Sequence, residues 1–196
     1  MGDHINLLRR LGACFEATQW AESQPDAETA WRQCPRGDWL LWIAARVDID
    51  RKLLVRGACA CARTALPRVP AGEERPRIAI EMAEAWSRGE ATLDDVLRAA
   101  RDAFTVWNNA YAAAVAASAA DADSAAHAAA YAAAADADVA PCVAADAAYA
   151  AADAAADAAA DAASAAYARS DSLARSADIV REILPWEAMS AKLEDK

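Results

Sequence analysis

Apolar side chains recur along this 196-residue chain at steps of three and four, the spacing of one face of an α-helix. The longest such stripe begins at Leu93 and continues through Val96, Ala100 and Trp107 to Val115. Alternation of apolar and polar residues, which is typical of a half-buried strand, is nearly absent. The pattern therefore predicts an all-α fold, a multi-helix bundle.

Residues that favour helix ends bracket the shorter apolar stripes. Asp38 is a candidate N-cap for a helix that ends at Val47, and we expect Trp39 or Trp42 of that helix to lie in the core. Four further signals complete the expected set: a capping box of Ser23 with Asp26, a helix opened by Asp50 and running to Leu66, a helix bracketed by Pro76 and Gly89, and a capping box of Thr92 with Asp95.

The chain then becomes alanine-rich: 38 of the 59 residues from Ala110 to Ala168 are alanine. Alanine has the highest intrinsic helix propensity, so this segment is expected to be helical rather than disordered. Pro141 is its one strong interruption. The sequence therefore predicts a single helical domain over 1–196, with short tryptophan-rich helices in 1–90 and two long, antiparallel alanine-rich helices at 91–138 and 140–184.

The second long helix has one polar stripe. From Cys142 to Tyr167 every residue other than alanine falls within an arc of about 120° around an ideal helix axis. The remaining surface is alanine, which allows a close approach of helix backbones, near the small end of the usual 8–10 Å range of interaxial distances. We therefore expect the alanine face between Ala148 and Ala162 to be buried against other helices.

Charge is distributed unevenly. The net charge is −10 and the pI about 4.7, and residues 103–168 carry eight Asp and no Lys or Arg. Nucleic acid and anionic membranes are bound through clustered Lys and Arg, so neither is expected as a direct partner, whereas a basic protein is. The candidate partner-binding residues lie on the polar stripe and are Asp146, Tyr149, Asp153, Asp157, Asp161 and Tyr167. The alternative is that the carboxylates only keep an alanine helix soluble.

No pattern indicates catalysis, a metal site or a cofactor. The two histidines, His4 and His127, are far apart in the sequence, and the chain has no glycine-rich phosphate loop and no Cys/His metal spacing. Enzymatic activity is not expected. The first residues lack an apolar signal-peptide core, and the longest uncharged stretch, 103–120, is a poor membrane span, so a cytoplasmic location is expected.

Cysteine, tryptophan and basic residues receive structural interpretations. The five cysteines are expected to be reduced thiols, and Cys14, Cys34, Cys61 and Cys142 to be small buried side chains. The seven tryptophans could form an aromatic ligand pocket, but filling the core between alanine helices is the simpler role. In the helix opened by Asp50, Lys52, Arg56 and Arg63 share one side, which is either a solvated face or a basic contact surface.

Four short segments, in order, give the chain a resemblance to a known family. They are Trp31, Cys34, Arg36-Gly37-Asp38-Trp39 and Trp42; RKLLVRGACACARTALP (Arg51 to Pro67); EAWSRGEAT (Glu84 to Thr92); and ADIVREILPW (Ala177 to Trp186). Together with the alanine tract between the third and fourth, they resemble the immunity protein family of bacterial polymorphic toxin systems, which is alanine-rich and all-helical. The resemblance implies a small cytoplasmic protein that binds and neutralises a toxin or effector, and it implies no catalytic residues.

The sequence therefore predicts a binding inhibitor that acts by stoichiometric protein–protein contact through an acidic helix face. Two alternatives remain: a phage-encoded antidefence inhibitor with the same binding logic, and a helical scaffold whose alanine faces pack between copies, for example in a homodimer.

Overall fold

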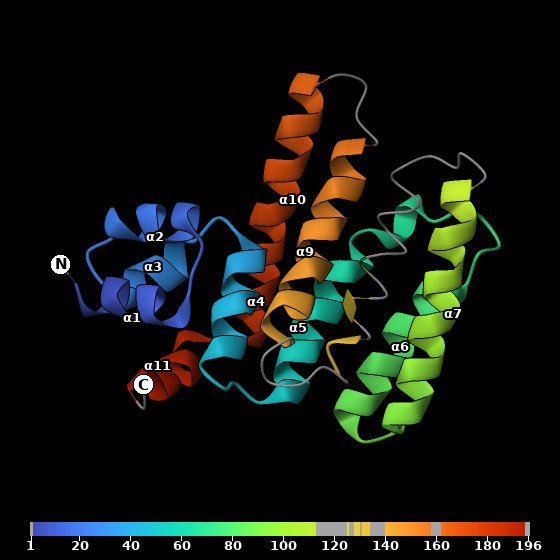
Figure 1. The fold of residues 1–196 in the computed structure, drawn as a ribbon, viewed down its shortest axis with the longest axis horizontal. Helices are drawn as coiled ribbons and strands as arrows, with labels where there is room; N and C mark the ends of the chain where they lie inside the picture. Colours follow the sequence, from blue (N-terminus) through green and yellow to red (C-terminus); the bar gives the residue numbers. More distant parts are fainter. Residues whose placement is uncertain are drawn as a thin grey trace.

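The computed structural model describes residues 2–112, 125, 128–129, 131–133, 140–157 and 162–194, with the side chains of 104–112, 140–143, 157 and 162–163 left out. Every regular element within these residues is a helix, which confirms the predicted all-α bundle (Figure 1). The helices are α1 (Asp3–Leu11), α2 (Phe15–Glu22), α3 (Ala27–Gln33), α4 (Gly37–Arg46), α5 (Arg51–Arg63), a 3-10 turn (Leu66–Arg68), α6 (Arg75–Arg88), α7 (Leu93–Ala112), α9 (Ala140–Asp157), α10 (Ala162–Ile183) and α11 (Trp186–Glu194).

Helix α9 lies at the centre of the bundle and packs on α4, α5 and α10. From α5 the packing continues outward to α6 and then to α7, which lies at one end of the molecule (Figure 1). The short helices α1, α2 and α3 lie at the opposite end, where α3 contacts α11. Segments far apart in the sequence, such as α4 and α10, are therefore neighbours in the core.

Three of the predicted helix ends are confirmed by hydrogen bonds or backbone angles. The carboxylate of Asp50 accepts from the backbone N–H groups of Lys52 (2.7 Å) and Leu53 (3.3 Å), which caps α5. Thr92 and Asp95 form the reciprocal capping box at the start of α7. Gly89 ends α6 in the left-handed region, with φ +81°.

Two predicted caps are wrong. Asp26, not Ser23, caps α3 by accepting from the Thr29 N–H at 2.7 Å. Helix α4 begins at Gly37, so Asp38 lies in its first turn and accepts two hydrogen bonds from the Arg36 guanidinium, at 2.8 and 2.6 Å. The start of α4 is pressed against α10: a Cβ on Gly37 would lie only 2.5 Å from the Cβ of Ser176.

The core position of the α4 tryptophans is also wrong. Leu40, Leu41 and Ala44 are the buried apolar side chains of α4, at 3%, 0% and 0% exposure, whereas Trp39 and Trp42 are half-buried. The reason is the alanine-rich α9 packed on α4, which leaves room for leucine and alanine at this contact. The indole rings lie on other sides of α4.

The single helix expected over 140–184 is two helices. Helices α9 and α10 pack against each other side by side, so one straight helix cannot span both (Figure 1). Small side chains of both helices are buried, including Ala151 of α9 and Ala177 of α10, each 0% exposed. Of the helix expected over 91–138, α7 covers Leu93–Ala112, and most of the remainder lies outside the described residues.

Burial of the alanine face is confirmed over the described part of α9. The ten alanines of this helix from Ala144 to Ala156 are buried except for Ala145 and Ala150, which are half-buried. The side chain of Ala162 lies outside the described residues. An alanine face can be fully buried only where neighbouring backbones come close. The alanines of α9 therefore require short interaxial distances to α4, α5 and α10.

The cysteines divide into two groups. Cys34, Cys59 and Cys61 are buried, and burial raises the pKa of the Cys34 and Cys61 thiols to about 12. Cys14 is exposed, so its predicted burial is wrong; it precedes the short helix α2 at the N-terminal end of the bundle. The side chain of Cys142 lies outside the described residues.

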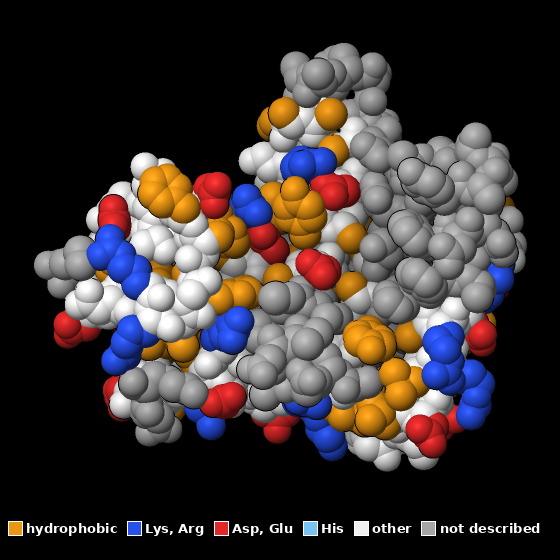
Figure 2. Space-filling view, viewed as in Figure 1, with side chains coloured by type: hydrophobic (Ala, Val, Ile, Leu, Met, Phe, Trp, Pro, Cys, Tyr) orange, Lys and Arg blue, Asp and Glu red, His pale blue; other side chains and the backbone are white. Residues whose placement is uncertain are grey.

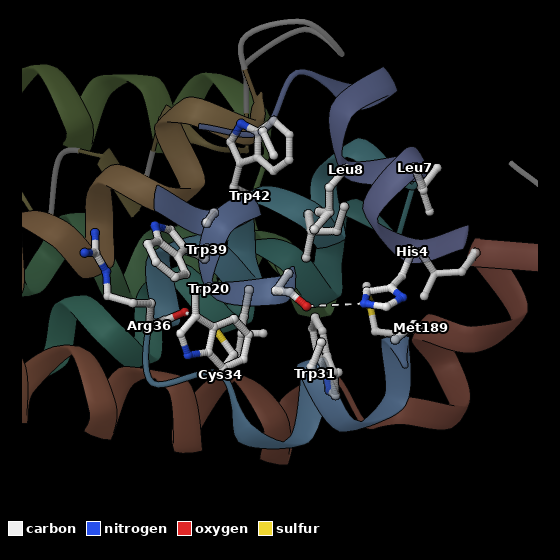
Figure 3. A pocket seen from close by; sticks show the side chains of 18 of the residues that line it. His4, Leu7, Leu8, Trp20, Trp31, Cys34, Arg36, Trp39, Trp42 and Met189 are labelled. Carbon is white, nitrogen blue, oxygen red and sulfur yellow. Dashed lines mark hydrogen bonds between the residues drawn. The ribbon is translucent and has the colours of Figure 1, made fainter. Parts of the chain in front are cut away.

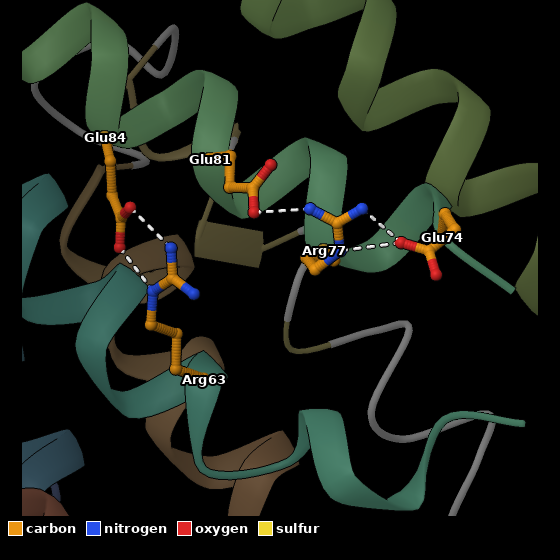
Figure 4. Close-up of polar contacts among 5 residues, drawn as sticks. All are labelled: Arg63, Glu74, Arg77, Glu81 and Glu84. Atoms are coloured by element: carbon orange, nitrogen blue, oxygen red, sulfur yellow. Dashed lines mark hydrogen bonds and ion pairs between the residues drawn. The ribbon is translucent and has the colours of Figure 1, made fainter. Parts of the chain in front are cut away.

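The basic residues of α5 do not form one free surface. Arg63 donates two hydrogen bonds to the Glu84 carboxylate of α6, at 2.6 and 2.7 Å (Figure 4). Along α6, Arg77 pairs with Glu74 and Glu81 in the same region. Arg63 thus joins two helices, whereas Lys52 and Arg56 are exposed.

The Ala155→Leu variant tests the close packing. Three added carbons at a site with 4% exposure should overpack the contact and lower the free energy of unfolding by about 1–3 kcal/mol. Thermal unfolding should then begin at a lower temperature, by about 2–4 °C for each kcal/mol. Ala166→Leu, on the exposed side of α10, is the matched control and should leave Tm nearly unchanged. Equal Tm values for both variants would contradict the packing described here.

Cys14 is expected to be the fast-reacting thiol among the cysteines with described side chains. The thiolate is the form of cysteine that attacks a disulfide reagent, and a pKa of about 12 keeps the buried Cys34 and Cys61 thiols protonated at pH 8. Cys14→Ser should therefore remove one rapidly titrating equivalent from the native protein. The total number of thiols titrated after unfolding should also be lower by one equivalent than in the wild-type chain. If the fast phase survived in this variant, the exposure assigned to Cys14 would be wrong.

Candidate functional site on α9 and α10

Three of the predicted site residues lie on the side of α9 that does not enter the core. Asp146, Tyr149 and Asp153 are separated by three and four residues and so share one helix face. Asp146 is exposed, the Tyr149 side chain is 40% exposed, and Asp153 is half-buried. Tyr167, on α10, is 75% exposed. The side chain of Asp157 and the whole of Asp161 lie outside the described residues.

Arg169 joins two of these residues. Its guanidinium Nη2 lies 2.6 Å from Asp153 Oδ1, and its Cζ lies 5.7 Å from the centroid of the Tyr149 ring. A guanidinium over a ring face is attracted by the ring quadrupole, so this cation holds the phenol in place while neutralising the carboxylate. Since α10 packs beside α9, the pair forms across the two helices.

Arg36 supplies a second cation close to the same tyrosine. It forms a bidentate pair with Asp38, and its Cζ lies 4.6 Å from the Trp39 ring centroid. The pKa of Arg36 is raised, mainly by the hydrogen bonds to Asp38, with a smaller contribution from the nearby Tyr149. Tyr149 therefore lies in a surface that combines aromatic rings, guanidinium groups and carboxylates. We call Arg36, Asp146, Tyr149, Asp153 and Arg169 the Tyr149 surface.

The charge of the Tyr149 surface differs from that of an uninterrupted acidic stripe. Figure 2 shows Lys or Arg and Asp or Glu side chains close together over the middle of this face of the molecule. Asp153 is paired with a cation, whereas desolvation by neighbouring groups raises the pKa of Asp146 even though its side chain reaches the surface. The segment without Lys or Arg thus receives cations from other elements, which linear charge counting does not reveal.

A cavity adjoins this surface, although the sequence favoured a core-filling role for the tryptophans over an aromatic ligand pocket. It has a volume of about 740 Å³, and Arg36, Asp38 and Ala145 contribute to its lining from the side of α4 and α9. Most of the other lining residues come from α1, α2, α3, α4 and α11 (Figure 3). The tryptophans were the only signal in the sequence, and the half-buried state of Trp20, Trp39, Trp42 and Trp186 became visible only in the fold.

The described residues contain no group of three or more His, Cys, Asp or Glu side chains arranged to hold a metal ion. Among the described helices, none is both long enough and apolar enough to cross a bilayer. The arrangement on α9 and α10 offers an exposed phenol, exposed and paired carboxylates, and guanidinium groups held by ion pairs.

Comparison of the chain with protein-family models, with curated proteins and with solved structures finds no match.

A double-mutant cycle tests whether Arg169 and Tyr149 interact. We expect Arg169→Gln and Tyr149→Leu to show a coupling energy of about 0.5–1 kcal/mol in chemical unfolding, the range for a cation over an exposed aromatic ring. Arg175→Gln is the control, because Arg175 pairs with Asp171 within α10. The coupling energy between Arg175→Gln and Tyr149→Leu should be zero, to within about 0.3–0.5 kcal/mol. Equal coupling in the two cycles would contradict a specific contact.

Proposed function

We propose that this chain is an immunity-type binding inhibitor, which neutralises a toxin or effector protein by stoichiometric contact through the Tyr149 surface together with Tyr167. The observation that carries the proposal is the placement of Tyr149: its ring is 40% exposed, yet it lies against Arg169 on a helix whose other sides are buried. An aromatic side chain exposed to solvent and held at a defined place is a typical anchor of a protein interface.

Rigidity supports the proposal energetically. Ordering side chains costs about 0.5–1.5 kcal/mol for each immobilised rotamer-rich group on binding. Here the ion pair of Arg169 with Asp153 and that of Arg36 with Asp38 exist before any partner arrives. Tyrosine and arginine are also among the residue types that contribute most at binding hot spots. The surface is thus pre-organised for contact.

Charge supports a basic partner. A net charge of −10 attracts positively charged proteins at long range and speeds their association. At short range, Asp146 offers an exposed carboxylate beside Tyr149. The toxin or effector class of the partner rests on the resemblance carried by the four sequence segments, the first of which includes Arg36 and the start of α4.

The self-assembly alternative has less support. It requires alanine faces that are available to a second copy, whereas the described alanine face of α9 is buried within the chain. Light scattering on the eluting protein tests this alternative, because a scaffold would show an assembly whose mass rises with concentration. A phage-encoded antidefence inhibitor would use the same contact surface, so the identity of the neutralised protein distinguishes it from an immunity protein.

The test of the proposed function uses a partner retained from the native host and then purified. Tyr149→Ala should weaken its binding by about tenfold or more, corresponding to at least ~1.4 kcal/mol. Asp146→Asn should mainly slow association and reduce its dependence on salt. Coexpression of the wild-type chain should suppress the toxicity of the partner, and Tyr149→Ala should restore it.

Two exposed positions elsewhere provide matched controls. Ile78→Ala removes an exposed apolar side chain from α6, and Glu182→Gln removes one negative charge from α10. Both should keep wild-type affinity. If the controls weakened binding as much as the site variants did, or if the retained protein were harmless without this chain, the proposed function would be wrong.

A further inference from the structure

The cavity of about 740 Å³ separates α4 from the N-terminal helices and α11. Figure 3 shows side chains from each of these elements directed into one space, with His4 from α1, Trp20 from α2, and Met189 from α11. Protein interiors are normally packed to the density of organic crystals, with few voids larger than a water molecule. A volume within the range of about 300–1,000 Å³ is instead typical of sites for small molecules.

The lining is largely apolar and aromatic. Five of the seven tryptophans contribute to it, and four of these five are half-buried. They are Trp20, Trp31, Trp39, Trp42 and Trp186. Trp20 and Trp39 approach each other with ring centroids 6.3 Å apart and planes inclined at 53°. Covering such surface stabilises a complex by about 25 cal/mol for each Å² removed from water, so an apolar occupant is favoured.

Several polar groups of the lining are already paired within the protein, whereas the buried indole Nε1 of Trp31 has no hydrogen-bond partner among the described residues. Arg36 donates two hydrogen bonds to Asp38, and the Cys34 thiol lies 3.5 Å from the Arg36 carbonyl oxygen, which accepts from it. His4 Nε2 lies 3.4 Å from the Ala21 carbonyl oxygen, and Ser190 donates to the Glu187 carbonyl. The charged side chains of Asp3, Arg10 and Glu194 are exposed, at the edge of the lining.

This pairing determines the charge of the occupant. A charged ligand in the apolar part of the cavity would lose water without gaining an unpaired counter-charge, which is costly. A cation has a further obstacle, because the guanidinium of Arg36 already lies over Trp39 at 4.6 Å. The occupant that matches the lining is therefore uncharged.

We propose that the cavity is a binding site for a neutral, mainly apolar small molecule with a planar ring system, which inserts between the tryptophan side chains of α2, α3, α4 and α11. This site adjoins the Tyr149 surface and shares Arg36 with it, but the proposal does not rest on the protein contact assigned to that surface. The planar ring follows from the indole lining, since aromatic pairs gain from offset-stacked or tilted contacts beyond the area they bury.

Two dyes with the same rings test the charge requirement. N-phenyl-1-naphthylamine is neutral, and 8-anilino-1-naphthalenesulfonate adds one negative charge to that ring system. We expect the neutral dye to bind the purified full-length chain saturably at one site and to quench tryptophan emission in proportion to occupancy. The anionic dye should bind at least tenfold more weakly at low and at high salt.

Cavity-filling variants locate the site. Ala30→Phe and Ala17→Phe place a ring in the lining from α3 and α2, and each should lower the affinity for the neutral dye at least tenfold. Ala166→Phe, on the exposed side of α10, adds the same group elsewhere and should bind the dye as the wild-type chain does. Circular dichroism and thermal unfolding of each variant establish that the helices are retained, and two filling positions guard against one that fails to fold.

Several results would overturn the proposal. Equal or tighter binding of the anionic dye would exclude the neutral-ligand assignment, and unsaturable binding would indicate nonspecific surface adsorption. Undiminished dye binding in both folded filling variants would place the dye elsewhere. If the neutral dye failed to bind while the filling variants lost affinity for a protein partner, the cavity would be a receptor for partner side chains instead. Tyr149→Ala should weaken binding of the protein partner but leave dye binding unchanged, because Tyr149 does not line the cavity. The two proposals can therefore fail independently of each other.

Discussion

Close packing through alanine is the constraint on which this structure depends. Helix α9 contacts α4, α5 and α10 with methyl groups, and Ala147, Ala148, Ala151 and Ala154 are each fully buried. Because alanine loses no side-chain entropy on folding, such a contact orders few rotatable groups, but it works only when the backbones come near each other. The neighbours are adapted to this requirement, as the contact of Gly37 with the backbone and side chain of Ser176 illustrates.

The same constraint explains why large aromatic side chains lie away from the centre. A core filled by alanine backbones has little space for indole rings, so Trp39 and Trp42 of α4 remain on its outer sides. Arg181 then ties the N-terminal helices to the bundle: from α10 it donates to the carbonyl oxygens of Trp31 (3.4 Å) and Cys34 (2.8 Å) at the end of α3. The cavity lies between that attached unit and α4.

The Tyr149 surface and the cavity are thus two results of one arrangement. Arg36 belongs to both, since it pairs with Asp38 in the cavity lining and lies near Tyr149 on the surface. Its position follows from the start of α4, where Gly37 permits the approach to α10. Because Gly37 allows this close approach, the Arg36 guanidinium lies at the boundary between the Tyr149 surface and the cavity.

The sequence by itself determined the helical class and many local features. Periodic apolar positions, the Asp50 cap, the capping box of Thr92 with Asp95 and the alanine face of α9 were all predicted, because each depends on residues within a few positions of one another. The aspartates and tyrosines of the candidate site were also predicted, because their spacing places them on one face of an ideal helix. For Asp146, Tyr149 and Tyr167 the structure places the side chains at the surface.

Only the tertiary structure decided what those residues face. The division of 140–184 into two helices, the return of Arg169 to Asp153 and Tyr149, and the enclosure of five tryptophans around a cavity all join distant parts of the chain. Such contacts depend on how backbones approach in space, and alanine makes that approach possible without specifying its partner. Helical periodicity identifies a face, and the packing of α9 determines which group lies across from it.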